Sequence, residues 1–101
     1  RVREKAKQAL YLRSCLFQGG TETGWTRAHQ LAHDKAIPLS DVRAMRAWFA
    51  RHVKTSYPGY KQWVKQGSPT DRSARTKHRG AVAWLLWGGT PAYHWIRGLL
   101  P

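Results

Sequence analysis

Cysteine is almost absent from the sequence, which contains Cys15 alone. One thiol excludes a disulfide within the chain and any zinc site that needs several cysteines. A reducing compartment is therefore permitted. Because Cys15 lies on the apolar side of a predicted helix, we expect it to be a small buried hydrophobic residue.

Acidic residues are scarce as well, with five Asp and Glu spread over 101 residues. A two-metal nuclease needs several clustered carboxylates, and no serine stands in the context of a nucleophile elbow. We predict no catalytic residues, no cofactor and no small-molecule substrate. A small DNA-processing enzyme is an alternative that these absences disfavour.

Long apolar runs are missing too. The longest, AVAWLLW at residues 81–87, has seven residues, whereas a membrane-spanning helix needs about 20. The basic residues before ALYLRSCLF resemble the start of a signal peptide, but Arg13 interrupts the apolar run and no small-residue cleavage site follows it. We therefore expect neither a signal peptide nor a membrane partner.

Two histidines have the spacing of metal ligands. His29 and His33 lie one turn apart in a predicted helix, but the glutamate that a zincin carries between them is missing. Cys15, Asp34 and His52 are the candidates for a third ligand, and none stands at a spacing that favours it. We predict no metal site.

Positive charge is what the sequence has in excess. Eighteen Lys and Arg against five acids give a formal net charge of +13 and a pI of about 11.0. Self-repulsion at this charge opposes compaction, so the imbalance indicates a polyanionic partner. Nucleic acid is the first candidate; an acidic protein surface or an anionic membrane surface would also match the charge.

Aromatic residues are the second excess, with six Trp, four Tyr and two Phe. Each large aromatic side chain can bury about 150–250 Å², which supplies a core for a chain short enough to be one domain. We predict an all-α fold, in which residues 1–101 form a single small basic domain. Four or five short helices surround a Trp-rich core and carry a long basic loop.

The spacing of apolar residues predicts the first three helices. Residues 1–18 form a basic N-terminal helix that ends at a glycine pair, and a second helix covers residues 25–34 after candidate threonine N-caps. Ser40 is the predicted N-cap of the third helix, whose arginines point away from its apolar side. The second and third of these helices could form a helix-turn-helix, although the connector between them, residues 35–39, is longer than the usual turn.

Residues 54–79 are predicted to be a long basic loop. Proline and glycine interrupt any periodicity, and seven Lys or Arg face a single acid, Asp71. We expect Tyr57, Tyr60 and Trp63 to hold the first half of this loop against the core. The second half, residues 68–79, has no apolar anchor, and long loops of this kind are usually functional or partly disordered.

Residues 80–97 are predicted to be a Trp-rich helical hairpin. A short helix over residues 81–87 ends at two glycines, and Thr90 caps a second helix that starts at Pro91. A base-stacking platform is disfavoured here, because stacking aromatics lie on open faces beside basic residues and this run is continuously apolar. The side chains expected to seal the core are Trp84, Trp87, Tyr93 and Trp95.

The candidate contacts for a polyanionic partner are the basic residues of the N-terminal helix, the third helix and the loop. No base-reading motif accompanies them, so nucleic-acid binding is expected to be independent of sequence. These residues are Arg1, Arg3, Lys5, Lys7, Arg43, Arg46, Lys61, Lys65, Arg72, Arg75, Lys77 and Arg79.

A wider pattern extends over residues 20–97. Its members are Gly24, Ala28, Leu31, Leu39, Ser40, Val42, Met45, Trp48, Phe49, Arg51, His52, Gly80, the run AWLLWGG at 83–89, and Trp95. The pattern resembles a small domain of uncharacterised role that recurs in tailed phages and large DNA viruses, beside head-assembly proteins or fused to them. The AWLLWGG run and the FxRH-type helix end are its specific parts. Members commonly carry an acidic residue after the two glycines, where this chain has Thr90.

The resemblance implies a viral protein in a virion or packaging context, located in the virion and, during assembly, in the host cytoplasm or nucleus. Together with the charge, it predicts a non-enzymatic structural or virion-associated protein that contacts nucleic acid through basic arms. The alternative is a minor capsid or cementing protein whose basic loop and termini dock onto neighbouring shell subunits.

Overall fold

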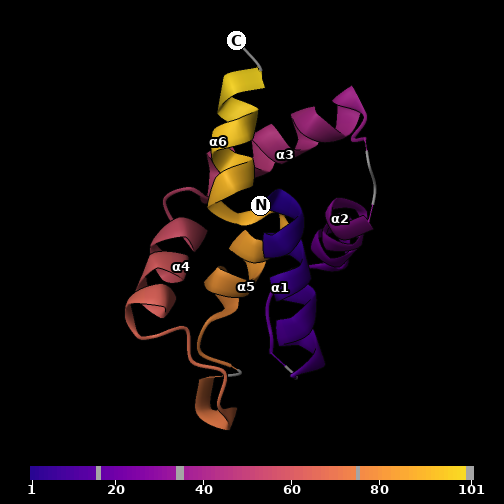
Figure 1. Ribbon diagram of the computed structural model, residues 1–101. Coiled ribbons are helices and arrows are strands. Elements are labelled where there is room, and N and C mark those ends of the chain that lie inside the picture. Colours follow the sequence, from indigo (N-terminus) through magenta and orange to yellow (C-terminus); the bar gives the residue numbers. More distant parts are fainter. Residues whose placement is uncertain (16, 34–35, 75, 100–101) are drawn as a thin grey trace.

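The regular structure of the chain is helical throughout the residues that the computed structural model describes, which are 1–15, 17–33, 36–74 and 76–99. The predicted all-α class is therefore confirmed, but the predicted count of four or five helices is too low, because the described residues form six α-helices. Figure 1 shows the order of the elements. They are α1 (Val2–Ser14), α2 (Glu22–His33), α3 (Leu39–His52), α4 (Ser56–Lys65), the 3-10 turn η1 (Arg72–Ala74), α5 (Arg79–Leu86) and α6 (Gly89–Leu99).

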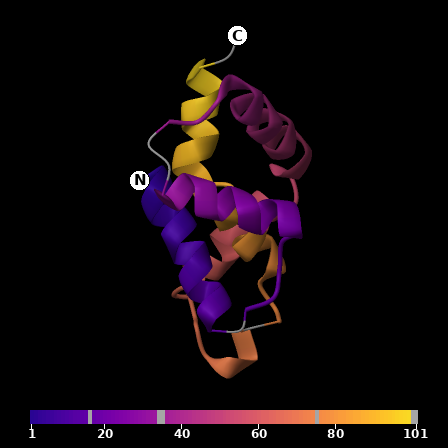
Figure 2. The same ribbon diagram turned by 90° about the vertical axis from the view of Figure 1, so that its right-hand side faces the viewer.

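Helix α5 lies at the centre of the molecule and contacts α1, α2, α4 and α6. In Figure 1, α1 and α4 flank it on opposite sides, α3 and α6 occupy one end, and η1 forms the other. Figure 2 shows α2 crossing α1. The molecule measures 40 × 26 × 21 Å, so the two ends of its long axis present separate surfaces.

The central position of α5 follows from its composition. Ala81, Val82, Trp84, Leu85 and Leu86 are all buried, and a helix that is apolar on every side must be enclosed by other elements. Burying these residues removes a large apolar area from water, which is the main favourable contribution to folding. The longest apolar run of the sequence is thus the axis of the core.

The predicted glycine stop of this helix is confirmed. Gly88 and Gly89 adopt φ values of 100° and 67°, a backbone conformation that residues with a side chain rarely take. Helix α6 starts directly at Gly89, so Thr90 lies inside it and is not its N-cap. The Thr90 hydroxyl instead accepts a hydrogen bond from Trp84 Nε1 at 3.2 Å, because the tight turn brings it within reach of the indole N–H.

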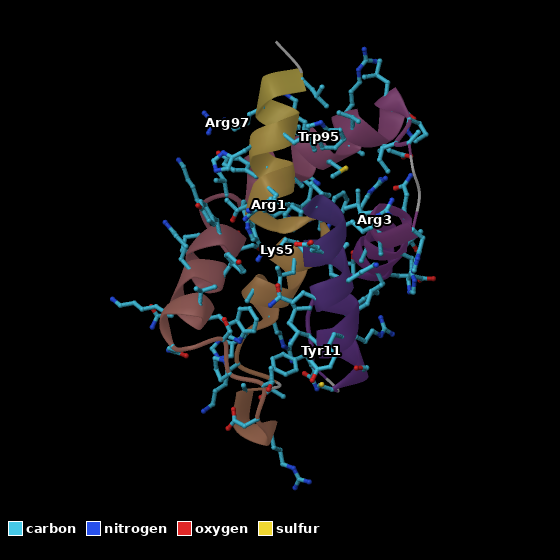
Figure 3. The ribbon with its side chains drawn as sticks, viewed as in Figure 1. Arg1, Arg3, Lys5, Tyr11, Trp95 and Arg97 are labelled. Carbon is cyan, nitrogen blue, oxygen red and sulfur yellow. The ribbon has the colours of Figure 1, made fainter. Side chains whose placement is uncertain are left out.

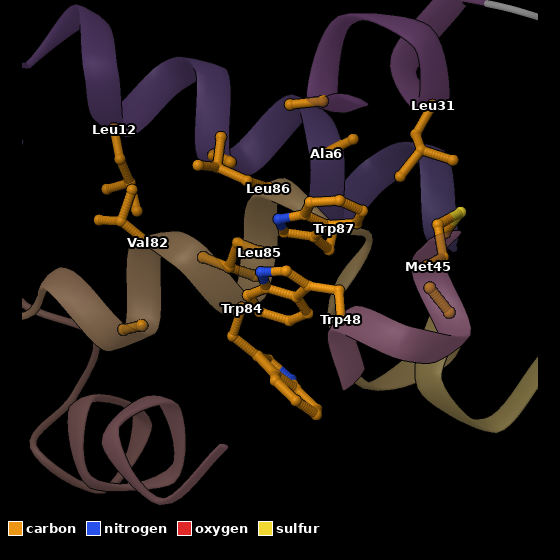
Figure 4. Close-up of a cluster of buried hydrophobic side chains, with 14 of the residues drawn as sticks. Ala6, Leu12, Leu31, Met45, Trp48, Val82, Trp84, Leu85, Leu86 and Trp87 are labelled. Carbon is orange, nitrogen blue, oxygen red and sulfur yellow. The ribbon is translucent and has the colours of Figure 1, made fainter. Parts of the chain in front are cut away.

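An aromatic cluster surrounds Trp84, which has no exposed surface. Its ring stacks on Tyr57 at 4.6 Å between centroids, and it meets Phe49 edge-on at 5.0 Å and Tyr93 at 5.5 Å. A second stack pairs Trp48 with Trp87, as Figure 4 shows beside the aliphatic core. The predicted Trp-rich core is confirmed for Trp84 and Trp87.

Trp95 is the exception among the predicted core residues. Its side chain is 39% exposed, whereas Ala92 and Ile96 carry the buried face of α6. Residues 92 and 96 are four apart and therefore share a face, while residue 95 points about 100° away from residue 96. The prediction that Trp95 seals the core is wrong.

The prediction of a loop over residues 54–79 is wrong for its first half, which contains α4. Pro58 occurs in the first turn of this helix, where a missing N–H costs no intrahelical hydrogen bond. Tyr57 and Tyr60 are partly buried and Trp63 is fully buried, so the aromatic residues hold this segment to the core as expected.

The second half of that segment is anchored as well, contrary to prediction. Ala74 is buried at 3% exposure, and Trp63 Nε1 donates a hydrogen bond to the carbonyl oxygen of Pro69 at 3.0 Å. Ser68 has φ = 52° and marks the change of direction after α4. The basic stretch beyond α4 is therefore a folded-back extension of the core.

Two helix starts also differ from those predicted. Helix α2 begins at Glu22, and the Thr21 hydroxyl accepts a hydrogen bond from the Gly24 N–H at 3.3 Å, which confirms a threonine cap. Helix α3 begins at Leu39, before the predicted cap Ser40. The reason is that the Pro38 carbonyl already accepts the N–H of Val42 at 3.1 Å.

Candidate nucleic-acid interface

The predicted contact residues are overwhelmingly exposed. Ten of the twelve have exposed side chains, Lys5 is half-buried, and Arg75 lies outside the described residues. Exposure leaves their charged groups available to a partner, but it does not by itself place them on one surface. The structure places most of them in three separate regions.

The first region lies where the start of α1 meets α6 and α4, and we call it the α1–α6 seam. A hollow of about 620 Å³ opens there, and Figure 3 shows Arg1, Lys5 and Trp95 along it. The seam brings together chain segments that are some ninety positions apart in the sequence. Its lining residues are Arg1, Lys5, Tyr60, Thr90, Pro91, His94 and Trp95.

Lys5 is positioned by the helices on both sides of it. A Cβ at Gly89 would lie 3.1–3.2 Å from two carbons of the Lys5 side chain, so the glycine makes room for the lysine stem. The Lys5 amine donates a hydrogen bond to the Tyr60 hydroxyl at 3.4 Å. The stem is thus packed against the turn, and the residue also lines the hollow, an arrangement that suits an amphipathic lysine.

Trp95 lies beside these cations with its ring partly open to solvent. Among the described residues it has neither a ring partner nor a hydrogen bond to its indole N–H. A second hollow of about 420 Å³, lined mainly by apolar residues, shares Arg1, Pro91 and Trp95 with the first. An exposed aromatic ring beside basic residues is the arrangement that base-stacking proteins use.

The second region is the outer side of α3. Arg43, Arg46 and Arg51 are exposed, and the exposed residues that separate them, Ala44, Ala47 and Ala50, are all alanines. Small side chains between the arginines allow a partner to approach the helix closely. This region lies at the α3 end of the long axis in Figure 1.

Asp41, in the first turn of α3, is directed toward α2. Gln30 Nε2 donates a hydrogen bond to one of its oxygens at 2.8 Å, and Arg27 pairs with the other at 3.3 Å. These contacts, that of Gln30 first, lower the pKa of Asp41 from its ordinary value against a smaller opposing effect of desolvation. The carboxylate is satisfied by α2 and does not neutralise the outer arginines.

The third region is the tip that contains η1, at the opposite end of the molecule (Figure 1). Arg72 and Lys77 are exposed there, and Arg79 donates a hydrogen bond to Gln18 Oε1 at 2.7 Å. The structure does not bring this tip together with the α3 face or with the seam. Lys7 on α1, and Lys61 and Lys65 on α4, lie outside both hollows of the seam.

The candidate metal ligands do not come together within the described residues. The rings of His29 and His33 stack at 6.3 Å, but no group of three or more His, Cys, Asp or Glu side chains comes together there. The candidate ligand Asp34 lies outside the described residues. Cys15 is half-buried, and its contact with Tyr11 raises the pKa of that phenol.

No helix in the described part of the chain is both long and apolar enough to cross a membrane. No protein-family model matches the sequence, and no significant match occurs among curated proteins or solved structures. The resemblance to the viral domain therefore stays a prediction. The functional argument depends on this chain's own residues.

Trp95 is the residue of this interface that the sequence prediction misassigned. The signal that could have identified it was periodicity, because residue 95 lies off the face shared by Ala92 and Ile96. The hollow itself had no comparable signal. It depends on how α1 packs against the Gly88–Gly89 turn.

Proposed function

We propose that this protein is a non-enzymatic, virion-associated protein that binds nucleic acid without sequence preference through its exposed cations. The observation that carries the proposal is the outer side of α3, where the exposed residues between Arg43, Arg46 and Arg51 are all alanines. Their positions cover about 12 Å of helix axis at 1.5 Å per residue. A duplex presents about one phosphate charge per 1.7 Å of its own axis, so each of the three arginines can contact a phosphate of the same duplex.

Arginine suits this role because its planar guanidinium donates two parallel hydrogen bonds to a phosphate. Contacts of this kind orient a protein on nucleic acid but read no bases, which agrees with the absence of a base-reading motif in the sequence. The viral context is a separate element of the proposal. It derives from the resemblance of residues 20–97 and not from the arrangement of the charges.

The test is the salt dependence of affinity for a duplex of mixed sequence. Each phosphate contact contributes about 0.9 to the slope of log K against log salt concentration, so five contacts cost on the order of a hundredfold or more between about 50 and 200 mM. Replacing Arg43, Arg46 and Arg51 with Gln should flatten the slope by about two to three. The melting temperature should not fall, because all three side chains are exposed and their removal lowers the repulsion between cations.

A matched variant carries Gln at three described cations of the η1 tip: Arg72, Lys77 and Arg79. Comparison of the two variants tells which end of the molecule contacts phosphate. Failure of the wild-type protein to bind duplex, or an affinity independent of salt, contradicts the proposal. If neither variant changes the slope, neither the outer side of α3 nor the η1 tip contacts phosphate.

Docking onto neighbouring shell subunits is the second candidate, and the apolar hollow favours it. Val2, Leu31 and Ile37 line this hollow beside Arg1 and Arg3, and apolar surface rimmed by charge is typical of protein contacts. Under this alternative, duplex affinity is weak with a shallow slope. Charge removal at the tip then prevents incorporation into assembled shells.

A further inference from the structure

We infer that the α1–α6 seam is a base-stacking site for single-stranded nucleic acid, with Trp95 as the stacking ring and the cations beside it as phosphate contacts. This inference rests on the proposed nucleic-acid binding and names the strand form that one of the three basic regions prefers. The α3 face and the tip are not part of it.

The first observation is how Trp95 differs from the other tryptophans. Four of them, Trp48, Trp63, Trp84 and Trp87, are buried with exposures of 7% or less. Trp25 is half-buried, and the Arg13 guanidinium covers its ring at 4.3 Å from the centroid. Among the tryptophans, Trp95 alone is exposed, at 39%, and its ring has no aromatic or cationic partner among the described residues.

The exposed part of the Trp95 indole has an energetic cost in a small protein. The area that Trp95 leaves in water contributes nothing to a core that this short chain needs. A nucleobase laid on the ring would recover that area, because base–aromatic stacking is favourable and tolerates any base. The exposed face of the Trp95 ring is therefore suited to contact with a flat apolar group such as a nucleobase.

The second observation is the chemistry of the walls. Arg1 and Lys5 supply positive charge and His94 supplies ring nitrogens, all within the hollow of about 620 Å³ that Trp95 lines. This volume lies within the range of about 300–1,000 Å³ typical of small-ligand sites. Because the Lys5 stem is packed against Gly89 and its amine contacts Tyr60, the cation is oriented before a ligand arrives.

Single strands fit this site better than a duplex does. A paired base is already stacked on its neighbours, and its faces are closed to a side chain, whereas an unpaired base can be laid on an aromatic ring. The second hollow shares Arg1, Pro91 and Trp95 with the first and has apolar walls formed by Val2, Leu31 and Ile37. It offers the adjoining base of the same strand an apolar surface.

The experiment measures affinity by fluorescence anisotropy for two labelled oligonucleotides of equal length. One is an oligothymidylate, and the other has the same phosphates but abasic sugars. The wild-type chain should bind the oligothymidylate about ten- to a hundredfold more tightly, as expected for one or two stacked bases. Trp95→Ala should abolish that preference and leave the affinity for the abasic strand unchanged, and Trp95→Phe should restore most of it.

Tyr11→Ala is the matched control. Tyr11 is 60% exposed on the same helix that supplies the cations but lines neither hollow, so its removal should change neither affinity. An oligouridylate of the same length distinguishes RNA from DNA as the source of the strand. Both strands support the inference if the preference over abasic sugars depends on Trp95.

Equal binding of the base-containing and abasic strands by the wild-type chain overturns the inference, while salt-dependent binding of both leaves the proposed function intact. Absence of any salt-dependent binding contradicts the proposed function itself. Binding to vesicles that contain anionic lipid tests the alternative that an exposed tryptophan beside cations contacts a membrane surface. If Trp95→Ala reduces vesicle binding and leaves oligonucleotide binding unchanged, the seam is a membrane contact and the inference is wrong.

Discussion

The hydrogen bond between Trp84 and Thr90 allows the packing of the turn after α5 to be tested by one isosteric substitution. Trp84 is 0% exposed, and its Nε1 donates to Thr90 Oγ1 at 3.2 Å. Thr90→Val keeps the shape of the side chain and removes the acceptor. The indole N–H then loses its partner inside the core, which costs about 1–3 kcal/mol.

For a domain of this size, each kcal/mol lowers the melting temperature by about 4–8 °C. Thr90→Val should therefore lower it by at least several degrees, measured by circular dichroism. Thr90→Ser keeps a hydroxyl and should be much closer to the wild type.

A double-mutant cycle with Trp84→Phe separates this hydrogen bond from a helix cap. Phenylalanine has no N–H, so Thr90→Val should cost little in the Trp84→Phe background. If Thr90 were the cap of α6, its loss would cost the same in both backgrounds. An equal cost would refute the hydrogen-bond argument and restore Thr90 as a cap.

Three further predictions concern the core, the acid range and metal. Trp87→Ala should destabilise by about 3–5 kcal/mol, enough to unfold a marginally stable domain; an unchanged thermal melt would contradict the core assignment. Because Gln30 lowers the pKa of Asp41 in the folded state, that contribution to stability is present above the unfolded pKa and is lost as pH falls below about 4. Asp41→Asn should flatten this acid limb, and an unaltered profile would count against it. Chelation should leave folding unchanged, since His29 and His33 find no third ligand among the described residues; stoichiometric zinc after purification would oppose this.

The turn between α5 and α6 could be predicted from the sequence because its chemistry is local. Two adjacent glycines after an apolar helix are a helix stop whatever surrounds them, and Gly88 and Gly89 both have positive φ. The aromatic core was predictable for a similar reason. Six tryptophans are the largest apolar side chains of a short chain, so several of them must be buried to form its core.

Helix α4 could not be predicted in the same way. Pro58 and Gly59 interrupt the sequence pattern that would mark a helix, and the packing of Tyr57 and Trp63 on the core supports the segment. The seam was equally hidden, because it forms where Lys5 packs on Gly89. Contacts between residues so far apart in the chain leave no periodic signal.

The excess positive charge should also set how the stability of the fold depends on salt, with a sign opposite to that of the proposed nucleic-acid binding. At +13, mutual repulsion of the cations opposes the compact state. The screening length falls from about 10 Å at 0.1 M salt to about 3 Å at 1 M, whereas the shortest dimension of the molecule is 21 Å. Added salt therefore screens repulsion across the whole fold, and the melting temperature should rise over the range in which nucleic-acid affinity falls. A melting temperature that stayed constant or fell would mean that the cations are already neutralised within the folded chain. The excess charge would then not indicate a polyanionic partner.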